Sequence, residues 1–254
     1  MGRFSFVREM ALRFIIEETN IRDTMNAVEQ NLANWKDSLL SSIPVGGLLS
    51  RNPVAYKWKA TFRVWMLREA VFWRLNDLMT QSYALHQQGH GLGARILLRS
   101  GFESLATLIY LNQLMQQVLD GKLSFHAFSD KTATLLLGSR DGSTEHQSVN
   151  IMTVLEKCDK RYPGIAKLYG ILSESAHPNY EGMVAGYSKI DHSEYETHFS
   201  NRWMELYGDR HLGSMELCMS TFHHEYNDVW PALMEKLESW IEANDTDLEA
   251  TKQA

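Results

Sequence analysis

The sequence is poor in cysteine and proline. It has only two cysteines among 254 residues, Cys158 and Cys218, and they do not form a Cys-x-x-Cys pair. This excludes a framework of several disulfides and a cysteine-rich zinc site. It also suits a reducing compartment, so we expect a cytoplasmic protein. The five prolines all fall where helices would begin, end or bend.

Long hydrophobic runs are also lacking. The N-terminal segment is apolar in places, but Arg8, Glu9, Arg13 and Glu17 interrupt it, so we expect no secretory signal. No apolar run approaches the roughly 20 residues that a membrane-spanning helix requires, so we expect no association with a membrane. The net charge of −6 disfavours a broad nucleic-acid-binding surface, which usually needs a basic face. A small, local basic site remains compatible with this charge.

Large apolar side chains recur at helical spacing over most of the chain. They predict helices over about 4–40, 54–88, 94–119, 124–137, 149–160, 165–176 and 212–242. The segment 180–201 contains glycine, tyrosine and irregularly spaced apolar residues, and it predicts a long functional loop with room for a short hairpin. The sequence therefore predicts an all-α bundle of about seven helices. We expect a single helical domain over 1–245 and a flexible C-terminal tail over 246–254.

The expected helix over 94–119 is the most informative part of the sequence. Its only charged residues are Arg95, Arg99 and Glu103, and at about 100° per residue these lie in one sector roughly 80° wide. The other sectors are apolar, which is typical of a central, buried helix. Because an isolated buried charge is very costly, we expect these three charges to be paired.

A second polar segment, SESAHPN, lies at the end of a later expected helix. Because Pro178 disfavours helical geometry at the preceding residue, His177 should stand at the helix terminus. An imidazole titrates near neutral pH and can move a proton, and a planar guanidinium can hold phosphate oxygens in a bidentate fork. The candidate site residues are therefore Arg95, Arg99, Glu103, Ser173, His177, Asn179 and Tyr180.

Two alternatives for these residues follow from the spacing alone. Glu174 and His177 match Glu-x-x-His, one half of the di-metal signature of four-helix bundles, but no other histidine follows a glutamate by three residues. We therefore expect no metal and no other cofactor. Alternatively, Arg99, Glu103 and His177 form a purely structural polar knot that fixes the register of the helices.

Aromatic side chains are concentrated in the expected loop, at Tyr180, Tyr187, Tyr195 and Phe199. Such side chains can stack on the bases of a nucleic acid or pack on the helical bundle. Packing is the more common role, and we expect it here.

The segments LLRSGFESLATLIYL and LSESAHPN together resemble a family of uncharacterised bacterial helical proteins. Its members carry an arginine and a glutamate four apart on an inner helix, and a Ser/His segment at the end of a later one. Here these positions are Arg99, Glu103, Ser173 and His177. That family is in turn similar to the HEPN superfamily of helical bundles, whose active members are metal-independent RNA endonucleases of toxin–antitoxin and antiviral systems.

The resemblance implies an Arg-x(4–6)-His motif, which in the HEPN superfamily is usually completed across a dimer. No arginine stands at this spacing before His177, so Arg99 would have to supply the guanidinium. The resemblance also implies that the chain forms a homodimer and that a cognate antitoxin or partner subunit exists.

Two functional hypotheses remain open. In the first, the chain is a metal-independent RNA-cleaving or nucleotide-binding protein of a bacterial defence or toxin type. His177 is then the general base on a ribose 2′-hydroxyl, Arg99 stabilises charge on the phosphate and Glu103 orients Arg99. Substrate binding would involve Arg95, Ser173, Asn179 and Tyr180. In the second, the chain is a non-enzymatic helical interaction protein, and the same residues are structural.

Overall fold

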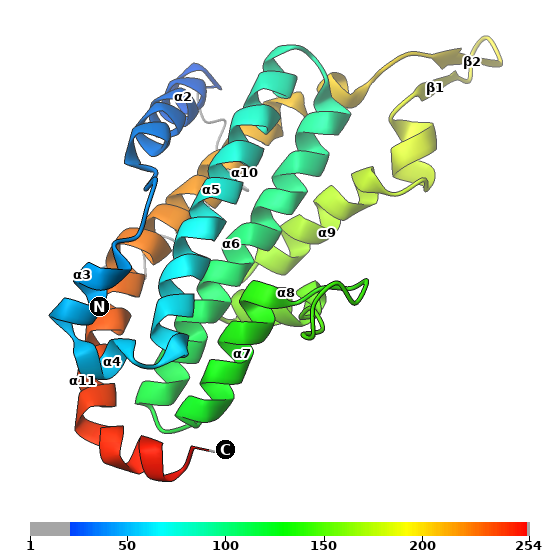
Figure 1. Cartoon of the computed structure of the whole chain (residues 1–254). Coiled ribbons are helices and arrows are strands. Elements are labelled where there is room, and N and C mark those ends of the chain that lie inside the picture. Colours follow the sequence, from blue (N-terminus) through cyan, green and yellow to red (C-terminus); the bar gives the residue numbers. More distant parts are fainter. Residues whose placement is uncertain (1–20, 253–254) are drawn as a thin grey trace. The chain divides into compact units, whose positions relative to one another are not determined.

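The computed structural model describes residues 21–252, and these are mostly helical (Figure 1). The described α-helices are α2 (Ile21–Ser38), α3 (Val45–Arg51), α4 (Pro53–Tyr56), α5 (Lys59–Gln87), α6 (Gly91–Leu119), α7 (Phe125–Leu137), α8 (Ile151–Arg161), α9 (Ile165–Ala176), α10 (Trp203–His224) and α11 (Trp230–Ala250). Two π-helical turns, η1 (Tyr180–Ala185) and η2 (Glu225–Val229), and two short strands, β1 (Ser188–Asp191) and β2 (Glu196–Phe199), complete the described elements. The all-α prediction is confirmed. None of these helices is both long enough and apolar enough to span a membrane.

Most helices lie where the apolar periodicity predicts them, but the helix expected over 212–242 begins nine residues earlier, at Trp203 of α10, and continues through η2 into α11. The helix expected over 54–88 begins as a separate turn, α4, because Asn52 caps it and Pro53 opens it. The side chain of Asn52 accepts a 2.9 Å hydrogen bond from the backbone N–H of Ala55. The helix expected over 4–40 appears as α2, and its part before residue 21 lies outside the described residues.

The chain is divided into two compact units. Unit 1 contains 21–38, 74–104 and 158–221 of the described residues, and unit 2 contains 39–73, 105–157 and 222–252. The long helices α5 and α6 contribute residues to both units. Each unit has its own buried side chains, and the single-domain organisation stays a prediction.

The core of unit 1 is built from close contact between α5 and α6. A Cβ atom added at Gly101 of α6 would lie 2.0 Å from Cε of Met79, so the absence of a side chain at Gly101 allows this approach. Leu75, Leu98 and Phe102 are fully buried beside it in the same unit. The periodicity that predicted a buried central helix is therefore confirmed for this part of α6.

The core of unit 2 contains a cluster of aromatic rings. The ring of Phe72 lies 5.2 Å from that of Phe222 and 4.8 Å from that of Tyr226, measured between centroids. The hydroxyl of Tyr226 donates to both carboxylate oxygens of Glu69, at 2.9 Å each. Burial raises the pKa of Tyr226, so the phenol stays protonated and keeps donating to Glu69.

Helix α11 extends further than the sequence predicted. It continues to Ala250, so residues 246–250 of the expected flexible tail are helical. Leu248 is buried on the same face as Ile241, seven residues before it. Lys57 also forms ion pairs with Asp245 and Glu249, at 2.7 Å and 2.9 Å. These contacts stabilise helical structure at this end of the chain.

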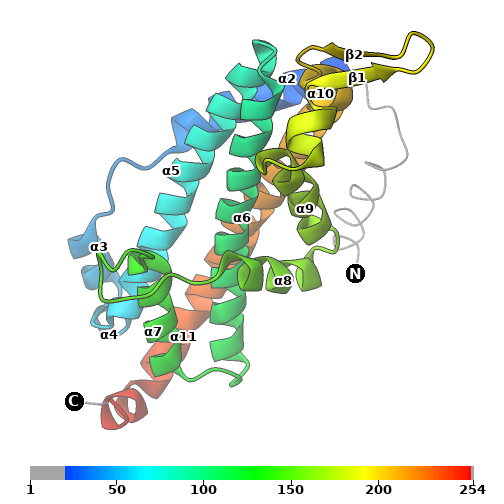
Figure 2. The same cartoon turned by 90° about the vertical axis from the view of Figure 1, so that its right-hand side faces the viewer.

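The expected loop 180–201 is more regular than predicted. It opens with η1 and continues into an antiparallel hairpin of β1 and β2, seen side by side in Figure 2. Ser188 lies opposite Phe199 in this hairpin, and Asp191 lies opposite Glu196. The turn ends at Tyr195, whose φ of 58° places it in the left-handed region. The hairpin that the sequence allowed is confirmed, whereas η1 was not expected.

Candidate functional site

Within unit 1, α9 lies beside α6 (Figure 1), and the three charged side chains of α6 contact side chains of α9. Nε of Arg95 donates to Oγ of Ser175, and Nε of Arg99 donates to Oγ of Ser173, both at 2.8 Å. As the residue number increases along α6, the number of its partner on α9 decreases, so the two helices run antiparallel here. We call the α6–α9 cluster the group Arg95, Arg99, Glu103, Tyr169, Ser173, Ser175 and Glu181.

Arg95 is the buried charged residue of the α6–α9 cluster, with 5% of the residue exposed. Besides Ser175, it donates to the carbonyl oxygen of Ile171 at 3.3 Å and lies 3.8 Å from Oε1 of Glu181. Its guanidinium carbon lies 3.9 Å from the ring centroid of Tyr207. Burial lowers the pKa of Arg95, against the opposing influence of Tyr207 and Glu181. An arginine nevertheless stays protonated, and its charge is stabilised here by Glu181, by its hydrogen bonds and by the ring of Tyr207.

Arg99 and Glu103 lie at the edge of the cluster. Nη1 of Arg99 is 3.2 Å from Oε1 of Glu103, and their side chains are 25% and 24% exposed. Tyr169 links the two, since its hydroxyl donates to Glu103 at 2.8 Å and accepts a hydrogen bond from Arg99. Burial and the bond to Glu103 raise the pKa of Tyr169. The expected pairing of these charges is confirmed, and solvent still reaches both of them.

Tyr169 and Ser175 were missed as members of the cluster by sequence reasoning. Tyr169 precedes Ser173 by four residues and therefore shares its face of α9. This spacing was a usable signal, but it became meaningful only once α9 was known to lie against α6. No such spacing pointed to Ser175, which lies between the candidate residues Ser173 and His177.

His177 lies apart from the arginines. It is the C-cap of α9 with an extended backbone, φ −96° and ψ 147°, as Pro178 predicted. The residue is exposed. Within residues 21–252, its imidazole makes no hydrogen bond or ion pair, including with Arg99 and Glu103. The structure therefore brings Arg99, Glu103 and Ser173 together and leaves His177 outside this group.

Asn179 begins η1. Its side-chain oxygen accepts a 2.9 Å hydrogen bond from the backbone N–H of Gly182, and its amide donates to Glu174 at 2.5 Å. A Cβ atom added at Gly182 would lie 2.0 Å from the carbonyl oxygen of His177, so η1 can turn this closely against the end of α9 only with glycine there. Asn179 therefore has a local structural role.

Large apolar side chains are unusually exposed between residues 180 and 199. We call this group the hairpin surface, and its residues are 47% to 95% exposed: Tyr180, Met183, Val184, Ile190, Tyr195 and Phe199. The expectation that the aromatic residues pack on the bundle is wrong for Tyr180, Tyr195 and Phe199. Tyr187 does pack, edge-on against Trp203 with 6.1 Å between ring centroids.

A second histidine of unit 1 is buried and was not singled out from the sequence. His211 stacks on His86 with 5.0 Å between ring centroids, and its Nε2 lies 3.0 Å from Oγ of Ser82. Ser82 donates to the carbonyl oxygen of Ala94 at 2.8 Å, so Nε2 of His211 is the donor toward Ser82. Burial lowers the pKa of His211 to about 3, and it is therefore neutral in the folded chain.

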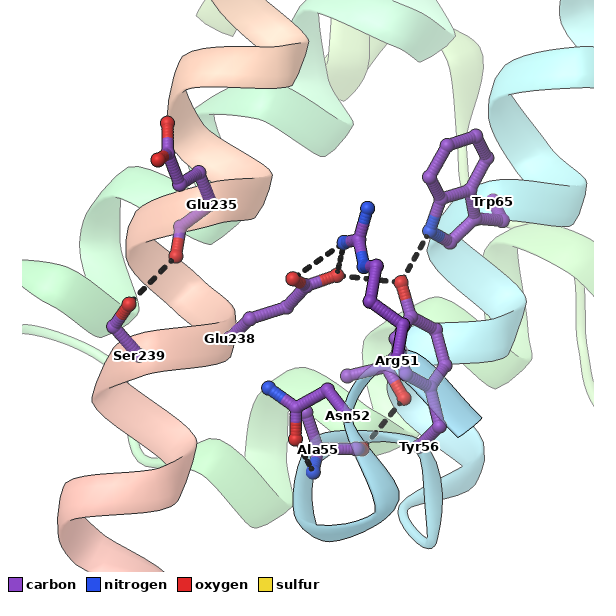
Figure 3. Close-up of polar contacts among 9 residues, drawn as sticks. Arg51, Asn52, Ala55, Tyr56, Trp65, Glu235, Glu238 and Ser239 are labelled. Atoms are coloured by element: carbon purple, nitrogen blue, oxygen red, sulfur yellow. Dashed lines mark hydrogen bonds and ion pairs between the residues drawn. The ribbon is translucent and has the colours of Figure 1, made fainter. Parts of the chain in front are cut away.

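Unit 2 contains a cavity of about 380 Å³, lined by Arg51, Trp65, Trp230, Pro231, Met234, Glu235 and Glu238. Figure 3 shows Arg51 and Tyr56 converging on the Glu238 carboxylate. The Tyr56 hydroxyl donates to Glu238 at 2.5 Å and accepts from Nε1 of Trp65 at 2.7 Å. The carboxylate is thus satisfied by protein donors, which indicates a structural role.

One Arg-x(5)-His pair does occur elsewhere, at Arg140 and His146. This pair was missed because only His177 was considered as the histidine of the motif. The pair lies in the loop between α7 and α8 of unit 2, where Arg140 is exposed and His146 is half-buried. The backbone N–H of Ser139 donates to the carbonyl oxygen of His146 at 2.8 Å and closes this loop.

Metal ligands do not gather in the described part of the chain, where no three His, Cys, Asp or Glu side chains lie together in a suitable group. No protein-family model matches the chain, and neither curated proteins nor solved structures give a match. The resemblance to the HEPN superfamily therefore stays a prediction.

Proposed function

We propose that the chain is a non-enzymatic helical interaction protein that binds through the hairpin surface. The observation that carries the proposal is the exposure of six large apolar side chains within the segment 180–199. Scattered exposed apolar residues are normal, but a concentrated group of them marks an interaction site. In this proposal the α6–α9 cluster is structural.

The buried part of the cluster supports this role because it reaches the base of the hairpin surface. Arg95 contacts Ser175, and Ser175 donates in turn to Oε1 of Glu181 at 2.8 Å. Glu181 belongs to η1, which leads into β1. One buried guanidinium therefore connects α6, the end of α9 and the turn that precedes the hairpin.

The other end of the hairpin is held by α10 and the residue before it. Nη1 of Arg202 donates to the carbonyl oxygens of Ser188 and Ala185, at 2.7 Å and 3.3 Å. The same guanidinium forms an ion pair with Glu205 at 2.8 Å. The base of the hairpin is thus anchored through Glu181, Ala185 and Ser188, while the side chains of the hairpin surface face solvent. A fixed base lowers the entropy that is lost when such a surface binds a partner.

Site-specific photo-crosslinking in the producing cell tests the proposal. A photoreactive phenylalanine analogue replaces Phe199 or Tyr195, and for comparison it replaces Met152 on α8, which is 49% exposed but lies outside the hairpin surface. We expect discrete adducts from positions 199 and 195 and none from position 152. Absence of any adduct from both hairpin positions would contradict the proposal.

The second candidate is a metal-independent RNA-cleaving or nucleotide-binding protein of a bacterial defence or toxin type. It is favoured by the His177 side chain, which is exposed and makes no hydrogen bond within residues 21–252. Arg99 is partly exposed, but its guanidinium already binds Ser173, Tyr169 and Glu103. Phosphate binding would have to displace these partners, which is why this candidate comes second.

An RNA-cleavage assay separates the two candidates. The wild type, His177→Ala and His146→Ala are purified and compared on the same RNA in the presence of a metal chelator. The second candidate predicts cleavage that leaves cyclic-phosphate or 3′-phosphate ends and is lost in His177→Ala. Loss in His146→Ala alone would instead assign the reaction to the loop pair Arg140 and His146. Equal cleavage by all three proteins would exclude both histidines as the base.

A further inference from the structure

The two outer edges of the hairpin can be distinguished from its hydrogen bonds. The backbone N–H of Ser200 donates to the carbonyl oxygen of Tyr187 at 3.0 Å. Hydrogen-bonded pairs alternate along an antiparallel ladder, so the next such pair includes His198 of β2. Thr197 and Phe199 therefore direct their backbone N–H and C=O groups outward, away from β1.

The edge of β1 is partly covered, whereas the edge of β2 is open. Ser188 of β1 is buried, and its outward carbonyl oxygen accepts the 2.7 Å hydrogen bond from Arg202. All four residues of β2 are exposed. In the part of the chain that the structure describes, the outward backbone groups of Thr197 have no hydrogen-bond partner. An open strand edge of this kind is a template for another strand.

The strand β2 is complementary to itself. If two copies pair antiparallel about a two-fold axis at Thr197, each Glu196 lies opposite His198 of the other copy, and Thr197 lies opposite Thr197. Threonine pairs and acid–base pairs are favourable across strands. The same register brings Phe199 alongside Tyr195 of the other copy, and these side chains are 80% and 95% exposed. The two-fold axis makes the contacts of Glu196 with His198 and of Phe199 with Tyr195 twice, and the contact between the two Thr197 residues once.

We propose that the hairpin surface binds a second copy of this chain, and that the outer edges of the two β2 strands pair about Thr197. This inference rests on the proposed function, because Phe199 of β2 belongs to the hairpin surface. A hairpin of two strands is only marginally stable by itself, and Asp191 lies opposite Glu196 within it, which places like charges across the ladder. Pairing of two hairpins forms a four-stranded sheet and satisfies the open edge.

The first test measures the mass of the purified full chain by light scattering over a range of concentrations. The wild type should approach twice the 29.2 kDa chain mass as concentration rises. Thr197→Pro removes the outward N–H but no hydrogen bond to β1. Because both copies carry the substitution, the dimer loses both of the hydrogen bonds that join the two Thr197 residues. The dissociation constant should rise by at least about tenfold, as expected for two lost hydrogen bonds. Thr197→Ala keeps the N–H and loses only the pair of threonine side chains, so it should weaken the dimer much less than Thr197→Pro.

The second test is a gain of cross-linking. Opposing residues that share hydrogen bonds in an antiparallel pair lie about 5.5 Å apart between Cα atoms, which suits a disulfide. Thr197→Cys should therefore form a disulfide-linked dimer on mild oxidation. Ser193→Cys, in the turn of the same hairpin, should not. The two native cysteines are buried, so they do not compete.

The outcomes of these tests and of the photo-crosslinking are distinguishable. A monomeric wild type at every concentration, or a Thr197→Pro variant that dimerises like the wild type, would overturn self-pairing. If positions 195 and 199 then cross-link to a protein of different mass, the proposed function stands and only the second copy is rejected. If those positions give no adduct and the wild type is monomeric, both proposals fail.

Discussion

Arg95 and Ser175 are joined by a 2.8 Å hydrogen bond, and both residues are almost completely buried. Ser175 extends this contact to Glu181, which belongs to η1. A charge on the central helix thereby determines where the chain leaves α9 and enters the hairpin. The residues of the hairpin surface follow Ser175 in the chain, and the contact of Arg95 with Ser175 and Glu181 helps to fix the backbone that carries them.

This relationship predicts unequal costs for the charges of α6. Arg95→Ala should lower the free energy of unfolding by about 3 kcal/mol, because it removes a buried guanidinium, leaves Ser175 without its donor and leaves Glu181 without its ion-pair partner. Glu103→Ala should cost only about 1 kcal/mol, because water reaches this position and can replace the lost carboxylate as the partner of Tyr169 and Arg99. Urea unfolding at neutral pH measures both. Equal costs would show that burial does not separate the two residues.

Gly182 provides a second prediction. In Gly182→Ala the new methyl group would collide with the carbonyl oxygen of His177, so η1 must shift and the free energy of unfolding should fall by about 1–3 kcal/mol. Amide hydrogen exchange should also accelerate at residues 182–188. The matched control is Gly170→Ala in α9, where a Cβ atom meets nothing within 4 Å. That change should stabilise the helix by about 0.5–1 kcal/mol.

His211 predicts a pH dependence with a definite sign. Its pKa is about 3 in the folded chain, against about 6.5 for an unperturbed histidine. Between these values the unfolded chain binds a proton that the folded chain does not, so stability is fully present above pH 6.5 and is lost as the pH falls. The loss from this one group is about 1.4 kcal/mol per pH unit.

Urea unfolding at pH 7 and at pH 5 checks this slope. His211→Gln removes the titrating group and should flatten the dependence by this amount. His90→Ala, a change at an exposed histidine, should leave the slope as in the wild type. A slope that survives in His211→Gln would mean that other groups cause it.

In unit 2, the contacts of Glu238 predict an order of stabilities. Tyr56→Phe removes a buried donor to Glu238 and the acceptor of Trp65, and it should cost about 1–2 kcal/mol. Arg51→Ala should cost less than about 1 kcal/mol, because the Arg51 side chain is 54% exposed and solvent screens its ion pair. Thermal unfolding of the two variants should therefore give the lower Tm for Tyr56→Phe.

The candidate site could be predicted in part from local signals. Helical spacing placed Arg95, Arg99 and Glu103 on one face, and Pro178 placed His177 at a helix end; the structure agrees with both. The prediction that Arg99 and His177 lie close together had no such local signal. Helical spacing relates residues of one helix, whereas these two residues belong to different helices. The end of α9 turns His177 toward solvent, while Ser173, one turn earlier, faces Arg99.

The sequence by itself determined that the described chain is helical and that α6 carries its charges on one apolar-bordered face. These properties follow from interactions between residues three or four positions apart. Only the tertiary structure decided that Arg95 meets Ser175, 80 positions away, and that Phe199 stays exposed while Tyr187 packs. The physical reason is that the burial of a side chain depends on which distant segments pack against it. The spacing of residues along one helix does not predict those segments.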